Sequence, residues 1–308
     1  MRFVVLGYHN IGCRCLDVLM RHKEQVPAVF THHDNPDENL WFDSMGKLAE
    51  SYKLSCYYPK NINDPKWVSI IRNIAPDIIF SFYFRQMLSK EILAIPRLGA
   101  INLHGSLLPK YRGRCPVNWV ILNGESETGV TLHYMLEKPD AGDIIAQKSV
   151  PIDFQDNAFT LFKKMEKAAA TLLDQTLLLI KAGTHKRLPQ DISKGSYFGG
   201  RNPEDGKIDW RKSNLEVYNL VRAVTHPYPG AFSLLDGKKV FIWECVPDNT
   251  APQSTPGEII MADKQKGLAI AAGKNTILIK KCQLENEPEM SAAEFIDKYN
   301  PLSGKILK

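Results

Sequence analysis

The sequence predicts an α/β protein whose first half forms a Rossmann-like domain with a mostly parallel sheet, followed by a small all-β domain. Short apolar runs alternate with helical patterns in the first half. In the second half, short strands recur about every ten residues with turns between them. The chain has 308 residues, of which 44% are hydrophobic and 24% charged. These values are ordinary for a globular protein of about two domains.

Five apolar runs in the first half are expected to form strands. They are Arg2–Gly7, Pro27–Thr31, Asp77–Phe84, Gly99–His104 and Gly129–Met135. A helical stretch around Lys66–Ile74 precedes the third run. Because strands that alternate with helices favour right-handed crossovers, we expect these strands to form a parallel sheet.

A long helix is predicted over Thr160–Ala182, with Gly183 placed to cap its C-terminus. The polar, glycine-rich stretch that follows predicts a first domain over residues 1–189, a linker over 190–204 and a second domain over 205–308. In the second domain we expect helices at Asn214–Val224 and Ala292–Tyr299. The strands expected there are Ala231–Leu235, Val240–Cys245, Gly257–Ala262, Leu268–Ala272 and Thr276–Lys281.

Composition excludes several classes of protein. No apolar run reaches about 18 residues, so no membrane span is expected, and the N-terminus is typical of a first strand rather than of a signal peptide. We therefore expect a cytoplasmic protein. Six scattered cysteines without a CxxC pair suggest neither zinc nor disulfides. The net charge of +5 is too small to indicate nucleic-acid binding by itself.

Asn102 and His104 stand two residues apart at the end of a predicted strand. The period of two places both side chains on the same face, at the edge of the sheet where ligands bind. Acyl transfer needs such a pair, because an amide can stabilise an oxyanion while a histidine moves protons. The alternative is a histidine whose hydrogen bonds are satisfied by backbone at a strand end.

The segment Lys138-Pro-Asp140-Ala-Gly-Asp143 follows the next predicted strand. A carboxylate near His104 would orient the ring, favour the imidazolium and raise its pKa. Read alone, this segment is also typical of an ordinary turn.

The turn Gly7-Tyr-His-Asn-Ile-Gly12 could hold a phosphate at a helix N-terminus or simply join a strand to a helix. It matches neither nucleotide fingerprint, which disfavours a nicotinamide-dependent oxidoreductase. Adjacent His32 and His33 would point to opposite faces of a strand, so no metal site is expected there.

The runs GAINLHGSLLPKYRGRCPVNW (99–119) and ETGVTLHYMLEKPDAGDIIAQ (127–147) resemble the folate-dependent formyltransferase family. Its signature, Asn-x-His followed by Asp, matches the candidate catalytic residues Asn102, His104 and Asp140. The resemblance implies 10-formyltetrahydrofolate as co-substrate and no metal. By the same resemblance, the folate site would be lined by Gln86, Met87, Leu88, Arg114, Leu136, Glu137, Lys138, Pro139 and Asp140.

The runs NPEDGKIDW (202–210) and HPYPGAF (226–232) resemble the OB-like C-terminal domain shared by the tRNA and sugar branches of that family. YHNIG (8–12), FTHHDNP (30–36) and SFYFRQML (81–88) are similar to the enzymes that formylate UDP-4-amino-4-deoxy-L-arabinose in lipid A modification and polymyxin resistance. Those enzymes are bifunctional, with a UDP-glucuronic acid decarboxylating dehydrogenase domain that this sequence does not include. The chain is either an excised domain or a free-standing enzyme, and a full-length form could be fused to or associated with a dehydrogenase.

The segment 31–46 argues for the sugar branch, whereas methionyl-tRNA formyltransferases use a basic loop there. It contains Asp34, Asp37, Glu38 and Asp43 and neither Lys nor Arg. Because gripping tRNA requires Lys or Arg against phosphates, this acidic segment disfavours tRNA, and we expect a nucleotide-sugar partner and no nucleic acid. Methionyl-tRNA formylation, another nucleotide-linked amino sugar, formyl-folate hydrolysis and a non-catalytic folate-binding module remain as alternatives.

The resemblance also implies roles for the three catalytic candidates. Asn102 would donate a hydrogen bond to the oxyanion, and His104 would serve the leaving nitrogen as an acid and help to take the amine proton. Asp140 would hold His104 in place.

Overall fold

The computed structural model describes residues 1–35, 39–300 and 302–308. It divides into two compact units. The first comprises residues 1–116, 127–151 and 162–199, and the second comprises residues 117–126, 152–161 and 200–308. The second unit thus takes in two short segments from earlier in the chain, and the long helix α6 (Ala158–Ala182) begins in the second of them. Among the described residues, no helix is both long and apolar enough to cross a membrane.

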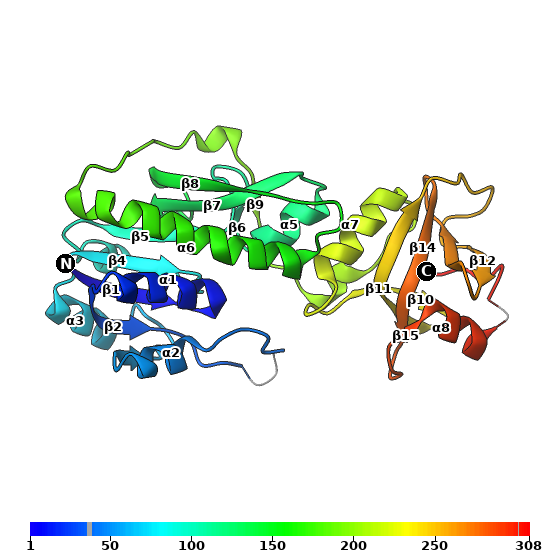
Figure 1. Cartoon of the computed structure of the whole chain (residues 1–308), viewed down its shortest axis with the longest axis horizontal. Helices are drawn as coiled ribbons and strands as arrows, with labels where there is room; N and C mark the ends of the chain where they lie inside the picture. Colours follow the sequence, from blue (N-terminus) through cyan, green and yellow to red (C-terminus); the bar gives the residue numbers. More distant parts are fainter. Residues whose placement is uncertain (36–38, 301) are drawn as a thin grey trace. The chain divides into compact units, whose positions relative to one another are not determined.

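The first unit is built on a seven-stranded sheet of order β3-β2-β1-β4-β5-β7-β8 (Figure 1). Its strands are β1 (Arg2–Gly7), β2 (Gln25–Phe30), β3 (Ser55–Tyr57), β4 (Ile78–Phe82), β5 (Ala100–His104), β7 (Glu127–Tyr134) and β8 (Ile144–Pro151). The pairs from β3 to β5 are parallel, whereas β5–β7 and β7–β8 are antiparallel. The predicted fold class, an α/β domain with a mostly parallel sheet, is confirmed.

The expectation that the fifth predicted strand runs parallel is wrong, because β7 is antiparallel to β5. The reason lies at the edge of the sheet, where β7 and β8 form an antiparallel pair. In β8, half-buried or buried residues alternate with exposed ones from Ala146 to Pro151, which is typical of an antiparallel strand with one solvated face. Neither β8 nor the short β3 was predicted from the sequence.

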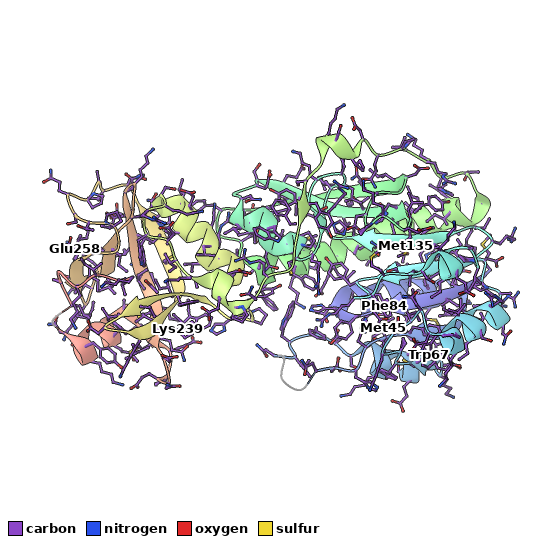
Figure 2. The ribbon with its side chains drawn as sticks, turned by 180° about the vertical axis from the view of Figure 1, so that it is seen from behind. Met45, Trp67, Phe84, Met135, Lys239 and Glu258 are labelled. Atoms are coloured by element: carbon purple, nitrogen blue, oxygen red, sulfur yellow. The ribbon has the colours of Figure 1, made fainter. Side chains whose placement is uncertain are left out.

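Helices cover both faces of this sheet because its strands are apolar on both sides. They are α1 (His9–Arg21), α2 (Met45–Ser51), α3 (Pro65–Ile74), α4 (Lys90–Leu93) and α6, with α5 (Pro116–Leu122) in the chain between β5 and β7. Val4, Leu6 and Phe30 belong to one buried core with α3 and α4. Trp67 and Phe84 are partly buried and pack against it (Figure 2).

The second unit contains an antiparallel sheet of order β10-β11-β14-β13-β12, with β15 paired to β14. Its elements are α7 (Asn214–Val224), β10 (Ala231–Leu235), β11 (Lys238–Asp248), β12 (Ile259–Asp263), β13 (Gly267–Ala271), β14 (Thr276–Leu284), β15 (Met290–Ser291) and α8 (Ala292–Tyr299). The last residues hydrogen-bond to both edges of the sheet. Lys308 exchanges two backbone hydrogen bonds with Leu234 in the edge strand β10, and the Leu307 N–H donates to the carbonyl of Gly257, next to the other edge strand β12. This bridging agrees with the predicted barrel-like second domain.

Candidate active site

Asn102 and His104 occupy the carboxyl end of β5, as the spacing predicts. His104 is buried, whereas Asn102 is half-buried. On one side β5 pairs with the parallel β4, and on the other side with the antiparallel β7. The antiparallel register sets Asn102 opposite His133 and His104 opposite Thr131. The two residues therefore face the third predicted member, Asp140, across the end of β7.

The His104 ring lies between two hydrogen-bond acceptors. Its Nε2 atom is 2.8 Å from the carbonyl oxygen of Tyr111, and its Nδ1 atom is 3.5 Å from Oδ1 of Asp140. Because a carbonyl oxygen only accepts, Nε2 carries the proton of the neutral ring and Nδ1 is bare. The ring thus turns its basic edge toward Asp140.

Burial lowers the pKa of His104, and it outweighs the opposing effects of the Asp140 charge and the Tyr111 hydrogen bond. The expectation that the pKa of His104 is raised is therefore wrong in its net direction. Asp140 does act in the predicted sense, but removal of the ring from water is the larger effect. The resting histidine is neutral, which suits a group that first accepts a proton.

Asp140 adopts a left-handed backbone conformation, with φ of 51°. Its Oδ2 atom accepts a hydrogen bond of 2.9 Å from the Gly113 N–H. Burial alone would raise the pKa of Asp140, but charge on His104 and the hydrogen bond from this N–H hold it well below its usual range. A strained conformation that persists at a charged, half-buried residue is typical of a functional site.

His133 completes the cluster, and the sequence analysis did not identify it. Its Nε2 atom lies 3.1 Å from Nδ2 of Asn102 and 3.6 Å from Oδ1 of Asp140. It is the link that joins Asn102 to the other two residues. A second histidine in the neighbouring strand was the available signal, but only the antiparallel register shows that it stands opposite Asn102.

The predicted folate-lining residues fall into two groups around the carboxyl ends of these strands. Gln86, Met87 and Leu88 follow β4, where the Gln86 side chain is already engaged, accepting from the Ile62 N–H and donating to the Pro59 carbonyl. Met87 is 49% exposed, whereas Leu88 is buried in the core. The structure thus leaves the Met87 side chain, rather than Gln86 or Leu88, to present an apolar surface.

The second group follows β7. Leu136, Glu137 and Lys138 are exposed, and Pro139 leads into Asp140. Arg114 is also exposed, and its N–H donates to the Phe198 carbonyl. Because Arg114 adjoins Gly113, which binds Asp140, it lies next to the catalytic candidates.

The glycine turn after β1 is a tight junction between strand and helix. The Tyr8 N–H donates to the Phe82 carbonyl, and a Cβ atom on Gly12 would lie 3.3 Å from that same oxygen. The close approach of α1 to the sheet therefore accounts for Gly12. Of the acidic segment after β2, Asp34 accepts from the Tyr8 hydroxyl and Asp43 pairs with Arg14, while Asp37 and Glu38 lie outside the described residues.

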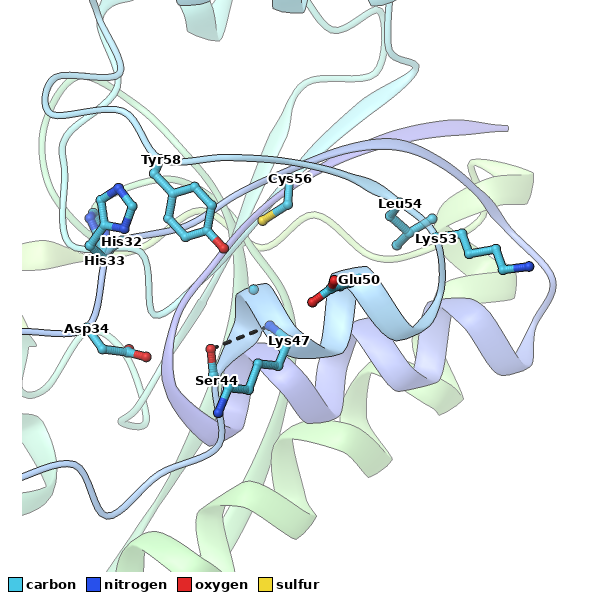
Figure 3. A pocket seen from close by; sticks show the side chains of 11 residues that line it. His32, His33, Asp34, Ser44, Lys47, Glu50, Lys53, Leu54, Cys56 and Tyr58 are labelled. Carbon is cyan, nitrogen blue, oxygen red and sulfur yellow. Dashed lines mark hydrogen bonds between the residues drawn. The ribbon is translucent and has the colours of Figure 1, made fainter.

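A cavity of about 630 Å³ lies beyond the carboxyl ends of β2 and β3, against α2 (Figure 3). The described residues that line it are His32, His33, Asp34, Ser44, Gly46, Lys47, Glu50, Lys53, Leu54, Cys56 and Tyr58. In the sheet, β1 and β4 separate these strands from β5. The predicted catalytic and folate-lining residues are not among those that line it. Within the described residues there is also no group of three or more His, Cys, Asp or Glu side chains that could hold a metal ion.

Solved structures of similar fold include sugar N-formyltransferases. One is the N-formyltransferase of Helicobacter canadensis, in complex with folinic acid and dTDP-3-aminofucose, with 23% identity, a TM-score of 0.70 and coverage of 90% of this chain and 98% of that one. Another is WlaRD, a sugar 3N-formyl transferase, with 23% identity, a TM-score of 0.69 and coverage of 94% and 99%. HypX from Aquifex aeolicus, with tetrahydrofolic acid, has 18% identity and a TM-score of 0.64, and the match covers all of this chain but 51% of that one.

The sequence also matches two family descriptions in order along the chain. The first, formyl transferase, covers residues 1–177, which contain every predicted site residue. The second, the formyl transferase C-terminal domain, covers residues 201–300. Together they span both units, and the first alone covers more than half of the chain. The chain therefore belongs to the formyl transferase family.

Proposed function

We propose that this enzyme transfers a formyl group from 10-formyltetrahydrofolate to the 4-amine of a UDP-4-amino-4-deoxy sugar, specifically UDP-4-amino-4-deoxy-L-arabinose, in the cytoplasm. Lipid A modification is the pathway that this acceptor implies. One observation carries the proposal. His104, with its basic nitrogen 3.5 Å from Asp140, shares a buried cluster with the amide of Asn102 at the carboxyl edge of an α/β sheet. That edge is where ligands bind in open sheets.

The similar structures support the choice of substrates. The Helicobacter canadensis enzyme is described with folinic acid and a dTDP-linked 3-amino sugar, and WlaRD with dTDP and a formyl-tetrahydrofolate. A folate derivative and a nucleotide-linked amino sugar are therefore the substrate classes that we assign to this chain.

The residues of the site fit a flat, partly apolar donor. Met87 follows β4 and Leu136 follows β7, the two strands that flank β5 in the sheet, and their side chains are 49% and 52% exposed. Large apolar side chains that remain exposed beside a buried polar cluster are typical of a ligand-binding surface. We therefore assign Met87 and Leu136 to the pterin ring of the folate.

In the proposed reaction the acceptor amine attacks the formyl carbon, and a C–N bond forms as the carbonyl oxygen becomes negative. Asn102 donates a hydrogen bond to that oxygen. The bare Nδ1 atom of His104 takes a proton from the amine as the amine becomes positive. The resulting imidazolium is stabilised by Asp140 on one side and by the Tyr111 carbonyl on the other. His104 then returns the proton to N10 of the folate as the bond between N10 and the formyl carbon breaks.

The acceptor class follows from charge as well as from similarity. The segment 31–46 has no Lys or Arg, and among its described acidic residues Asp43 pairs with Arg14. A surface of this kind lacks the cations that tRNA phosphates require. A small nucleotide sugar needs far fewer such contacts.

A panel of acceptors tests the proposal. The enzyme is incubated with 10-formyltetrahydrofolate and, in separate reactions, UDP-4-amino-4-deoxy-L-arabinose, dTDP-linked 3- and 4-amino sugars, and methionyl-tRNA. We expect the highest kcat/KM with the UDP-linked 4-amino sugar. A dTDP-linked sugar as the best acceptor would overturn the nucleotide assignment. Formylation of methionyl-tRNA that steepens at low salt would overturn the sugar assignment.

A further inference from the structure

The amide of Asn102 has two edges, and only one of them can serve the proposed reaction. The Nδ2 edge donates hydrogen bonds, whereas the Oδ1 edge only accepts them. Rotation of the amide by half a turn would point an acceptor at the developing oxyanion and repel it. The reaction therefore requires something in the protein that selects one of the two orientations.

The structure supplies this selection through His133, which is 1% exposed. The Nδ1 atom of His133 lies 2.8 Å from the carbonyl oxygen of Tyr134. Because that oxygen can only accept, Nδ1 carries the ring proton and Nε2 is a bare acceptor. Nε2 lies 3.1 Å from the Asn102 amide nitrogen, which donates one of its two hydrogens to it. The second hydrogen stays available for a ligand.

The opposite orientation of the amide would meet an acceptor rather than a donor. It would place Oδ1 of Asn102 against the bare Nε2 of His133, which itself lies 3.6 Å from the carboxylate of Asp140. Acceptors facing acceptors in a buried site cost free energy, since neither gains a hydrogen bond.

Strand geometry holds His133 at this place. Asn102 and His133 are direct partners in the antiparallel ladder between β5 and β7. The pairing of β7 with β8 shifts register between Leu132 and His133. Irregularities of this kind commonly re-aim a side chain beside an active site.

We propose that His133 is a positioning residue, which fixes the amide of Asn102 with its N–H edge toward the formyl oxygen. This inference rests on the proposed function, because it assigns His133 a part in that reaction. His133 touches neither the formyl group nor the amine and acts through Asn102.

Two variants of similar side-chain volume test it. His133→Gln keeps an acceptor at the reach of Nε2, whereas His133→Leu removes it. We expect His133→Leu to lower kcat about ten- to a hundredfold with little change in KM for 10-formyltetrahydrofolate, because an oxyanion donor of this kind contributes roughly 10²–10³. His133→Gln is expected to restore most of that loss. Thermal melting of both variants checks that they fold.

A double-mutant cycle separates positioning from a merely structural role. If His133 acts through Asn102, then His133→Leu costs almost nothing further in an Asn102→Ala background. Additive losses in the double variant, or a wild-type kcat in His133→Leu, would overturn the proposal.

A measurement on the protein without any amino-sugar substrate keeps this test independent of the proposed function. In protein labelled with ¹⁵N at asparagine, the Asn102 side-chain amide signal is identified by its loss in Asn102→Ala. His133→Leu is expected to shift that signal, and His133→Gln to leave it nearer the wild-type position. An unchanged signal in His133→Leu would refute the positioning of the Asn102 amide by His133. A shifted signal in an enzyme that formylates none of the amino sugars or methionyl-tRNA would support that positioning and refute the proposed function.

Discussion

The Nδ1 atom of His104 lies 3.5 Å from Oδ1 of Asp140. On the other side of the ring, Nε2 is bound to the carbonyl oxygen of Tyr111 at 2.8 Å. Burial keeps the resting ring neutral by lowering the pKa of His104. A proton that arrives during the reaction nevertheless finds an acceptor at each nitrogen. The arrangement suits a group that takes up a proton only transiently.

Replacing His104 by glutamine is expected to lower kcat about 10²- to 10⁴-fold, the usual contribution of a general acid–base group. Glutamine preserves a polar side chain near the Tyr111 carbonyl, so the fold should persist. The measurement is the initial rate of formyl transfer, with circular dichroism as the check on folding. Wild-type turnover, or an unfolded variant, would indicate that His104 is structural.

Asp140→Asn is expected to lower kcat and to move the acidic limb of the kcat–pH profile to lower pH. The sign follows from the charge, because Asp140 raises the pKa of His104 against the effect of burial, so its loss lowers that pKa further. Asparagine tolerates the left-handed backbone at this position, where φ is 51°. The profile is measured at saturating substrate over the acidic range.

The matched control is Asp143→Asn, three residues along the same turn. Asp143 pairs with the exposed Arg187 at 3.2 Å and should leave the profile unchanged. An acidic limb that stays in place in Asp140→Asn, or that moves equally in both variants, would remove Asp140 from the account.

Gly113→Ala is expected to reduce both stability and activity. Gly113 has φ of 95°, and a Cβ atom there would lie 2.2 Å from the Phe198 carbonyl oxygen. The backbone must shift, and the Gly113 N–H then moves away from Asp140. We expect a loss of more than about 1 kcal/mol in the free energy of unfolding, which chemical denaturation measures. Gly199→Ala is the control, since a Cβ atom there would meet no atom within 4 Å, and equal losses in the two variants would contradict the argument.

Acid is expected to destabilise the enzyme, starting below the ordinary histidine pKa of about 6.5. Burial, with lesser effects of Arg85 and Lys163, lowers the pKa of His9 to about 3, while burial and Arg85 lower that of His32 to about 4. Between these values and about 6.5 the unfolded chain binds protons that the folded chain does not. The free energy of unfolding therefore falls as the pH falls, by up to about 1.4 kcal/mol per pH unit for each such histidine.

His9→Asn tests this slope and keeps a residue that tolerates the φ of 63° at this position. The variant loses the stacking of the His9 ring on Phe42, whose ring centroid is 4.1 Å away, at every pH. The loss in the free energy of unfolding relative to the wild type should be smaller at pH 5 than at pH 8. The reason is that the variant lacks the histidine that takes up a proton when the wild type unfolds. Urea denaturation at both pH values measures this, and a constant difference would show that His9 does not titrate as described.

The sequence predicts much of the fold because strong patterns carry it. The helices at Asn214–Val224 and Ala292–Tyr299 begin and end where they were predicted, each after a serine that caps its N-terminus. The direction of β7 was not predictable, because the alternation in Gly129–Met135 fits either direction of pairing. Only its partner β8 settles the matter, and the sequence analysis had not identified that strand.

The candidate site, too, could be predicted only in part from the sequence. The period of two places Asn102 and His104 on one edge, and the family resemblance adds Asp140, which the structure brings to 3.5 Å from His104. The part played by His133 depends on the register between β5 and β7, which no local pattern encodes. The direction of the pKa shift of His104 depends on two opposing effects, the burial of the ring and the nearby charge of Asp140. Residue types alone do not determine which of the two is larger.

Mass spectrometry of one reaction tests the proposed formyl transfer directly. The enzyme, 10-formyltetrahydrofolate and UDP-4-amino-4-deoxy-L-arabinose are mixed, and the nucleotide-sugar product is followed over time beside an Asn102→Ala control. We expect a product heavier by one formyl group, formed at about 1–10³ per second by the wild type and at least about a hundredfold more slowly by the variant. A product that never forms, or that forms equally fast in the variant, would contradict the proposed reaction.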